Sequence, residues 1–446
     1  MAVSLRKTPT RRLRGLGSNG RTKQSGLIPF YISGSSALVA FAVLSAMTLF
    51  VNLGYLVYIP TTVFYTGMVP ELTESKTLYS IIFYAVSIGA IFLHRENYLP
   101  KIFTWIFFVL SNLTYYTYYV SDISVVVIST VFFVIFCAIS PQMFGRLSFA
   151  LRINPCVPIS LINWCFWVSL LCGFYFLARN GFHINPDLFV FEGVYDVRFE
   201  VTGGRTFIEN ILFSTTTKLF SVLALGYYVH SRNVWRAVAV AFAIALMYST
   251  SAQKSILFFA AITCIVTVGK GPKQNAMIGL GLATGIFALC AIPQVEGSAS
   301  WAAHSFLTRR LLLIPAWLNV EYVNFFQNSP MYLSHSILNG LFRSYSGPGP
   351  TWEMGYFLWG FGTSLNNGVF SDGFMNFGYI GTAVYLFISL GAVLFQLRFV
   401  HPAMRAVVLV YIWQLNNSAF ITTFITHGLG VFILIGLFLF GRDRLK

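Results

Sequence analysis

The feature that most constrains this chain is a series of twelve apolar segments, each about long enough to cross a bilayer as a helix. Hydrophobic residues make up 56% of the chain and charged residues only 10%, too few to cover the surface of a soluble protein. The sequence therefore predicts an all-α polytopic membrane protein with about twelve transmembrane helices. The segments are 33–57, 77–93, 101–120, 122–140, 157–178, 208–229, 235–252, 255–269, 275–293, 374–396, 403–422 and 426–441.

The distribution of charge predicts the orientation of these helices. With the N-terminus in the cytoplasm, the inner side receives most of the 29 Lys and Arg residues but only Glu96 and Asp443 among the fourteen acidic residues. Such an excess of Lys and Arg marks the cytoplasmic side of a membrane protein, so both termini are expected to be cytoplasmic. The net charge of +15 is dispersed in short clusters, which argues against a face that binds nucleic acid.

The connections divide the chain into a tail, a membrane domain and two long outer loops. Residues 1–27 are rich in Arg, Lys, Gly and Ser and are expected to form a disordered cytoplasmic tail, not a removable signal peptide. Residues 28–446 are expected to form one transmembrane domain, with periplasmic loops at about 179–207 and 294–373. The second loop contains aromatic residues and a Gly-Pro-Gly-Pro motif at 347–350, which predict short helices lying at the membrane interface and a rigid turn.

Several basic residues lie where a membrane protein rarely places them. Lys218 is in the middle of an apolar segment, Lys254 stands at the outer end of another, and Arg309 and Arg310 follow the ninth segment on the outer side. Arg198 lies in the first long loop. Because Arg presents a fork that matches phosphate oxygens and Lys adds a point charge, these residues predict a site for the diphosphate of a lipid-linked molecule. The alternative to a diphosphate site is that Lys254 extends to the lipid headgroups and Arg198 forms a surface ion pair.

A polar stretch, Leu365–Gly381, leads into the tenth apolar segment and includes Asn366, Asn367 and Asp372. One interpretation is structural, with the amides in a turn and Asp372 as the N-cap of the next helix. The functional interpretation makes all three side chains hydroxyl-binding groups at the mouth of a cavity, with Asp372 as a general base. The sequence leaves both open.

The remaining polar candidates are weaker. His304 and His335 on the long outer loop are more typical of surface histidines than of bases, and His427 is expected to hydrogen-bond between helices. Glu321 and Glu353 either pair with arginines or act as bases. The six cysteines lie in or beside apolar segments without metal-ligand spacing, so they are expected to be small buried hydrophobic residues, and no metal or cofactor is predicted.

The order of these features resembles the bacterial O-antigen polymerase family, also called oligosaccharide repeat-unit polymerases, which is related to the O-antigen ligases. The similarity in topology covers most of the chain from residue 28 onward, and the similarity in residues is confined to short segments. These are Tyr195–Arg198, Lys254-Ser255, Arg309–Pro315 with the aromatic Tyr322, Phe325 and Phe326, and Asn367–Gly381.

The resemblance implies a GT-C-like glycosyltransferase acting at the periplasmic face of the bacterial inner membrane. A hydroxyl of a lipid-linked repeat unit would attack the anomeric carbon of the growing glycan and release undecaprenyl diphosphate, without a metal and with inversion. Carried over to this chain, Lys254 and Arg309 would hold the diphosphate, Arg198 would contribute from the first loop, and Arg310 is able to replace Arg309. Asp372 would be the candidate base.

The sugar-binding candidates are Tyr195, Trp352, Asn366 and Asn367. The ligases have a His where Asn366-Asn367 stands here, which favours a polymerase over a ligase and leaves the base open. Trp317 is among the tryptophans that are candidates to stack on sugars, although an interfacial belt explains such residues equally well.

Three other classes of protein compete with this interpretation. A ligase-type glycosyltransferase shares the outer site, a secondary transporter or flippase typically has twelve spans, and a membrane acyltransferase needs a catalytic His. Transporters bind substrate at the midplane between internal repeats, whereas this sequence shows no clear repeat and gathers its charges at the outer edge, Lys218 excepted. The expected partners are the lipid-linked oligosaccharide and the bilayer, and the sequence leaves open whether a chain-length regulator protein binds.

Overall fold

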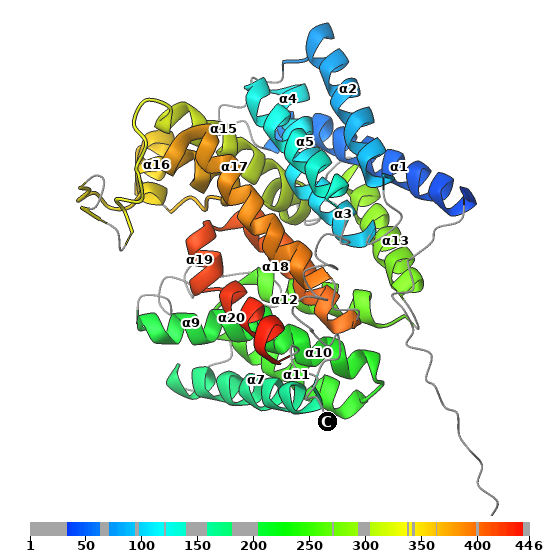
Figure 1. Ribbon diagram of the computed structural model, residues 1–446, viewed down its shortest axis with the longest axis vertical. Helices are drawn as coiled ribbons and strands as arrows, with labels where there is room; N and C mark the ends of the chain where they lie inside the picture. Colours follow the sequence, from blue (N-terminus) through cyan, green and yellow to red (C-terminus); the bar gives the residue numbers. More distant parts are fainter. Residues whose placement is uncertain are drawn as a thin grey trace, which may run out of the picture.

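The structure is a computed structural model, and it describes residues 34–62, 71–93, 98–119, 122–139, 158–180, 204–269, 272–292, 304–336, 339–340, 344–362, 364–397 and 401–439. These residues form helices joined by turns (Figure 1), which confirms the all-α prediction. Within the described residues, eleven of the twelve apolar segments fall largely on one helix or one continuous helical run, and segment 403–422 is the exception. In chain order, with η for π-helical segments, the elements are α1 (Gly34–Thr62), α2 (Glu74–Ile91), α3 (Tyr98–Thr104), η2 (Trp105–Leu110), α4 (Ser111–Tyr118), α5 (Ile123–Ala138), α7 (Ile159–Arg179), α9 (Phe207–Thr215), η4 (Thr216–Phe220), α10 (Ser221–His230), α11 (Val234–Ser249), α12 (Lys254–Thr267), α13 (Pro272–Cys290), η5 (His304–Leu313), α15 (Ile314–Phe326), α16 (Pro350–Trp359), α17 (Val369–Leu397), α18 (Pro402–Asn417), α19 (Phe420–Ile425), α20 (Leu429–Leu434) and η6 (Ile435–Leu439).

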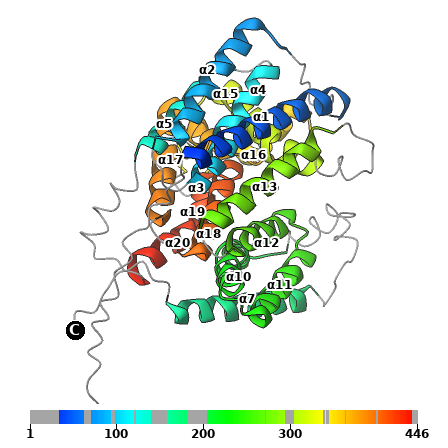
Figure 2. The ribbon, with the colours of Figure 1, turned by 90° about the vertical axis from the view of Figure 1, so that its right-hand side faces the viewer.

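The helices form two groups with α18 between them (Figures 1 and 2). One group contains α1–α5, α13 and α15–α17, and the other contains α7 and α9–α12. Helix α18 packs on α10 and α12 on one side and on α3, η2 and α17 on the other. It therefore contacts both groups, which also meet directly where α12 packs on α13.

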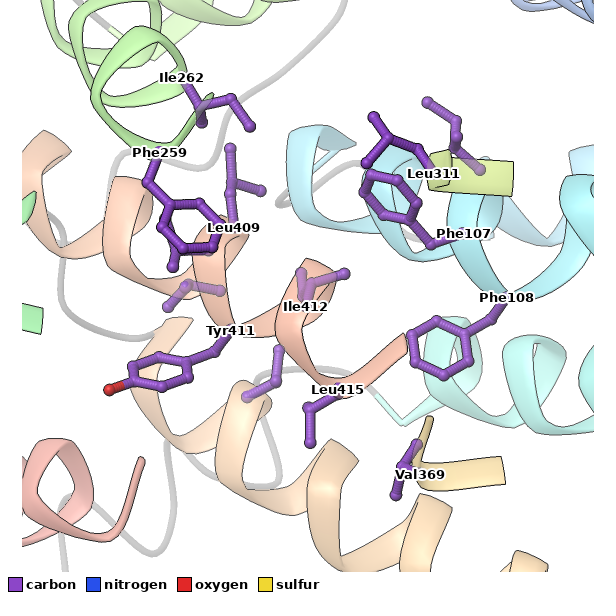
Figure 3. Packing of buried hydrophobic residues seen from close by; sticks show 14 of the residues in the cluster. Phe107, Phe108, Phe259, Ile262, Leu311, Val369, Leu409, Tyr411, Ile412 and Leu415 are labelled. Atoms are coloured by element: carbon purple, nitrogen blue, oxygen red, sulfur yellow. The ribbon is translucent and has the colours of Figure 1, made fainter. Parts of the chain in front are cut away.

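Apolar side chains from several elements meet along α18 (Figure 3). Leu409, Ile412 and Leu415 of α18 are fully or almost fully buried, as are Phe259 of α12 and Val369 of α17. In a membrane, where lipid is as apolar as these side chains, close packing rather than exclusion of water holds such helices together. The position of α18 is thus fixed by contacts from both groups.

Local sequence sets the start of several helices. Thr206 Oγ1 accepts the N–H of Glu209 at 3.3 Å, and the Glu209 carboxylate accepts the N–H of Thr206 at 2.7 Å, which is a capping box at the start of α9. Asp122 caps α5 by accepting the N–H of Ser124 at 2.8 Å. The capping box fixes the N-terminal end of α9, which lies next to the basic residues described below.

Helix α17 contains a sharp kink at Phe377 and Gly378. Gly378 has φ 62° and ψ −151°, a conformation that a residue with a Cβ atom rarely adopts. The kink brings Gly373 so close to Gly381 that a Cβ atom on Gly373 would lie 2.7 Å from the Gly381 carbonyl oxygen. The glycines of the polar stretch therefore serve the path of the backbone. The N-cap interpretation of Asp372 is wrong, because α17 already begins at Val369.

Two single helices, α7 and residues 369–396 of α17, have both the length and the hydropathy of a membrane span. Two other predicted segments, 101–120 and 208–229, are continuous helical runs divided by the π-helical segments η2 and η4. Segment 403–422 differs from its prediction, because the helix ends at Asn417 and a new helix begins at Phe420.

The predicted long outer loop contains η5, α15 and α16, which agrees with the short helices expected there. The Gly-Pro-Gly-Pro motif forms a bend that leads into α16. The interfacial position stays a prediction, and Trp317 and Phe326 of α15 are only 4% and 2% exposed and pack in the interior. The physical reason is that α15 lies against α17 and α4.

Candidate functional site

The carboxylate of Asp372 is buried and forms the centre of a polar cluster. Its Oδ2 atom accepts the main-chain N–H of Phe420 at 2.8 Å, and its Oδ1 atom accepts Nδ2 of Asn376 at 3.1 Å. Asn376 Oδ1 in turn accepts the N–H of Leu333 at 2.9 Å. We call these four residues the Asp372 cluster. They join α17, the start of α19 and the turn 331–336, three parts of the chain that lie far apart in sequence.

The turn 331–336 is held in a strained conformation against α17. Tyr332 and Leu333 have φ of 51° and 61°, which is rare for residues with bulky side chains. The N–H of Tyr332 donates to the Asn376 carbonyl oxygen at 3.1 Å, so the strain is maintained by the Asp372 cluster. His335 belongs to the same turn, and burial lowers its pKa. Strained backbone of this kind is enriched at functional sites.

Two segments that the sequence analysis singled out pack directly on each other. Tyr322 of α15 donates to the Leu365 carbonyl oxygen at 3.3 Å, and Ser371 of α17 donates to Asn319 Oδ1 of α15 at 2.6 Å. On the same helix, Glu321 accepts the Trp317 indole N–H at 3.0 Å, and burial raises the pKa of this carboxyl group. The arginine-bearing run 304–326 and the polar stretch 365–381 therefore form one unit.

The predicted cations lie on different elements. Arg309 is partly buried and Arg310 is exposed on η5, whereas Lys254 is partly buried at the first residue of α12. The main neighbours of α12 are α10, α11, α13 and α18, and those of η5 are α1, α4, α13 and α15. The two elements thus share α13 as a neighbour. Arg198 and Tyr195 lie outside the described residues, so the convergence of the three cations stays a prediction.

A basic cluster at the C-terminal ends of α7 and α11 and the N-terminal end of α9 was not among the predicted site residues. Arg205 donates to the Thr250 carbonyl oxygen at 3.2 Å and stacks over the rings of Phe213 and Phe176 at 4.1 and 5.0 Å. Burial lowers the pKa of Arg205 to about 10, which leaves the guanidinium charged at neutral pH. Arg179 pairs with Glu209 at 2.6 Å.

The turn that receives Arg205 leads to Lys254. Thr250, whose carbonyl oxygen accepts from Arg205, begins the turn between α11 and α12, and Ala252 in this turn has φ 52°. Lys254, two residues after Ala252, is the first residue of α12. The sequence signal for this arrangement was the capping box of Thr206 and Glu209, which places Arg205 directly before a helix.

The candidate sugar-binding residues differ in exposure. Asn366 is exposed and Trp352 is 40% exposed on α16, so both can contact a substrate. Asn367 is buried, and the buried Trp317 packs near Trp359 with their ring centres 6.1 Å apart. A sugar-stacking role for Trp317 is therefore wrong, because its ring faces the interior.

The buried Lys218 and the partly buried His427 form a second polar cluster. Lys218 Nζ lies 2.6 Å from Ser214 Oγ and 2.8 Å from His427 Nδ1, and His427 Nε2 lies 3.0 Å from Ser418 Oγ. We call these four residues the Lys218–His427 cluster. His427 lies in the turn between α19 and α20 and hydrogen-bonds to Ser214 and Lys218 of the run 207–230, so the bond expected between helices runs from a turn to a helix.

Both clusters contact the segment 418–428. Phe420 contacts Asp372, and Ser418, two residues earlier, contacts His427. The break between α18 and α19 therefore frees a main-chain N–H for Asp372 and places a hydroxyl against the imidazole. The buried Asp372 and Lys218 and the partly buried His427 are organised around this break.

The cysteines described with side chains are free, and Cys137, Cys165 and Cys172 are buried as predicted. No family model, curated protein or solved structure matches this chain. Function is therefore argued from the sequence and the geometry.

Proposed function

We propose that this protein is an oligosaccharide repeat-unit polymerase of a bacterial inner membrane. In this proposal the twelve helical segments span the bilayer with both termini in the cytoplasm, and the active site faces the periplasm. The enzyme transfers a growing glycan from undecaprenyl diphosphate to a hydroxyl of a lipid-linked repeat unit, with inversion at the anomeric carbon and with side chains rather than a metal neutralising the diphosphate.

The observation that carries the proposal is the packing of the run 304–326 on the stretch 365–381. The first segment brings Arg309 and Arg310, and the second brings the exposed Asn366 and the buried Asp372. A glycosyl transfer to a hydroxyl needs cations for the leaving diphosphate and polar groups for the acceptor sugar in one place. Hydrogen bonds from α15 to Leu365 and to Ser371 of α17 join these two segments of the chain.

Each group has a defined role in the proposed reaction. The guanidinium of Arg309, with Lys254 and Arg198, neutralises the charge that develops on the diphosphate as the anomeric C–O bond breaks. Asp372 takes the proton of the attacking hydroxyl, since each of its carboxylate oxygens has a second lone pair beyond the hydrogen bonds described above. Asn366 and Trp352 contact the sugars.

Deletion of the gene in its native host tests the proposal, with the surface polysaccharide separated on a gel. Loss of the long-chain ladder with single repeat units still attached to the cell surface supports a polymerase. Loss of all attached units indicates a ligase or a flippase, and an unchanged ladder contradicts the proposal.

A pair of arginine variants refines this test. Arg309→Ala is expected to abolish long chains while the protein remains in the membrane, because the leaving group loses its fork of donors. Arg343→Ala, in the same predicted outer loop, is the matched control and is expected to have a mild effect. Normal chain length in Arg309→Ala contradicts the diphosphate role.

A further inference from the structure

A lysine and a histidine are in direct contact in the interior, and the proposed glycosyl transfer uses neither. Lys218 is 6% exposed, and its Nζ atom lies 2.8 Å from His427 Nδ1. Within the described part of the chain no carboxylate pairs with Lys218 or His427, and the ion pairs found there lie elsewhere. A buried basic pair without a counter-ion is costly, so it is a candidate for function.

The contact allows the pair to hold only one extra proton. A hydrogen bond between two nitrogen atoms needs one donor and one acceptor, and a protonated imidazole has no acceptor. The Ser418 hydroxyl at 3.0 Å from Nε2 suits a proton on Nε2, which leaves the lone pair of Nδ1 facing Lys218 and Ser214. Adding a second proton would place two positive charges 2.8 Å apart.

The other titratable groups near the pair are few, and those on α7 and α18 are a thiol and a phenol, which are neutral at neutral pH. On α7 the Cys172 thiol lies 3.4 Å from Thr216 Oγ1, and on α18 the Tyr411 hydroxyl donates to the His427 carbonyl oxygen at 2.9 Å. Helix α12 carries Lys254 at its outer end and Cys264 near its other end.

The titratable groups of the remaining neighbours point to other partners. The tyrosines of α10 contact Asn163 and His401, and His401 also faces His230 at the end of that helix. Glu209 of α9 pairs with Arg179, and Asp372 of α17 contacts Phe420. A proton added to the pair therefore creates a charge that no contacting group offsets.

The backbone around the pair is irregular on both sides. Lys218 lies in η4, a π-helical segment, and such segments are frequent at functional sites. His427 lies between the short helices α19 and α20, next to Gly428, whose φ is 83°. A Cβ atom on Gly428 would lie 2.7 Å from Thr215 Cγ2, so only glycine lets this segment approach the lysine-bearing helix. The segment 418–428 thus has contacts that are able to change without disrupting a long helix.

We propose that Lys218 and His427 form a proton-binding site in the membrane interior, and that the bound proton sets the position of the segment 418–428. Binding forms one N–H bond, breaks one O–H bond of a hydronium ion and adds one positive charge. The new charge attracts the Asp372 carboxylate, which contacts the other end of the same segment through Phe420. This inference goes beyond the proposed glycosyl transfer and holds whether or not the chain joins glycans.

Nitrogen-15 NMR of the full chain in lipid bilayers, with labelled histidine, tests the site directly. The chain has 7 His residues, so the signal of His427 is assigned by its loss in His427→Gln. Between about pH 8 and pH 5 the wild type is expected to keep His427 in the neutral Nε2–H form while its Nδ1 signal shifts in one step. Absence of any step in the wild type overturns the proposal without the need for a variant.

Two lysine variants separate the pair from general effects of pH. Lys218→Met is expected to abolish the step, and the signals of the other six histidines show whether this variant folds. Lys254→Met, a matched change on neighbouring α12, is expected to leave the step unchanged. The same step in Lys218→Met contradicts a proton shared with His427.

Spin labels test the movement of the segment. Phe424 on α19 and Ile208 on α9 are exposed, so cysteines at these positions accept labels in a chain whose six native cysteines are replaced by Ala. The distance between the labels is expected to change across the same pH range in the wild-type background and not in Lys218→Met. An unchanged distance in the wild-type background contradicts the coupling.

Discussion

Replacing Asp372 by Asn is the most informative single change in the fold, because it removes one acceptor and changes almost no volume. In the wild type one carboxylate oxygen accepts from Phe420 N and the other from Asn376 Nδ2. In Asp372→Asn the amide oxygen is able to serve only one of these donors, and the new NH2 group faces the other. Asn376 cannot turn its own amide to compensate, because its Oδ1 atom accepts the N–H of Leu333.

The expected cost follows from this count of hydrogen bonds. One buried donor left without an acceptor costs about 1–3 kcal/mol, and removal of a buried charge offsets part of it. We expect Asp372→Asn to lower the free energy of unfolding by about 1–2 kcal/mol. Asp372→Leu leaves the Phe420 N–H without an acceptor and leaves Asn376 Nδ2 only the main-chain carbonyl oxygen of residue 372, at 2.8 Å, and is expected to cost about 2–5 kcal/mol.

Equilibrium unfolding of the purified protein in mixed micelles measures these values. Asp122→Asn is the matched control, since Asn caps a helix about as well as Asp and the change is expected to cost less than about 0.5 kcal/mol. If Asp372→Asn is as stable as the wild type, the carboxylate does not hold α19 in the way the hydrogen bonds indicate. Loss of long chains in a stably folded Asp372→Asn would instead point to the proposed role as a base.

Three further changes test other parts of the structure. Gly381→Ala is expected to lower the free energy of unfolding by at least about 2 kcal/mol, because the new Cβ atom meets backbone across the kink of α17. Gly391→Ala in the same helix has open space around the new Cβ atom and is expected to be neutral or stabilising. Unfolding in micelles compares the two variants, and equal stability contradicts the packing. Arg205→Ala is expected to lower the free energy of unfolding by about 2–3 kcal/mol in the same assay, because it loses a desolvated contact with two aromatic rings and a charged hydrogen bond. A loss below about 0.5 kcal/mol contradicts this environment of Arg205. Lys254→Ala is expected to abolish long chains on a polysaccharide gel with protein still in the membrane, and a normal ladder removes Lys254 from the site.

The positions of the helices were predictable because apolarity is a local property of the sequence. Within the described residues, all the predicted segments except 403–422 fall largely on one helix or one continuous helical run, and Lys218 lies within a helical run as its position indicated. The break after Asn417 was not predictable in the same way, since residues 418–422 are as compatible with a helix as those before them. What ends the helix is a tertiary contact, the hydrogen bond from Phe420 to a carboxylate 48 residues away in sequence.

The candidate site was predictable in its parts and not in its connections. The sequence singled out Arg309, Asp372 and Tyr322, and the structure adds that α15 and α17 hold these segments together. The sequence offered no sign that Asp372 is fully buried, because a carboxylate before an apolar segment is as often an exposed helix cap as a buried group. Arg205 was overlooked for a similar reason, since its aromatic partners belong to two helices that meet only in the fold.

Reconstitution of the purified full chain in lipid vesicles with an undecaprenyl-diphosphate-linked repeat unit tests the central claim most directly. The account predicts a ladder of lengthened lipid-linked glycans with free undecaprenyl diphosphate released at each addition, and no ladder with Arg309→Ala. Vesicles that contain folded protein and produce no ladder from the repeat unit of the native host would contradict it.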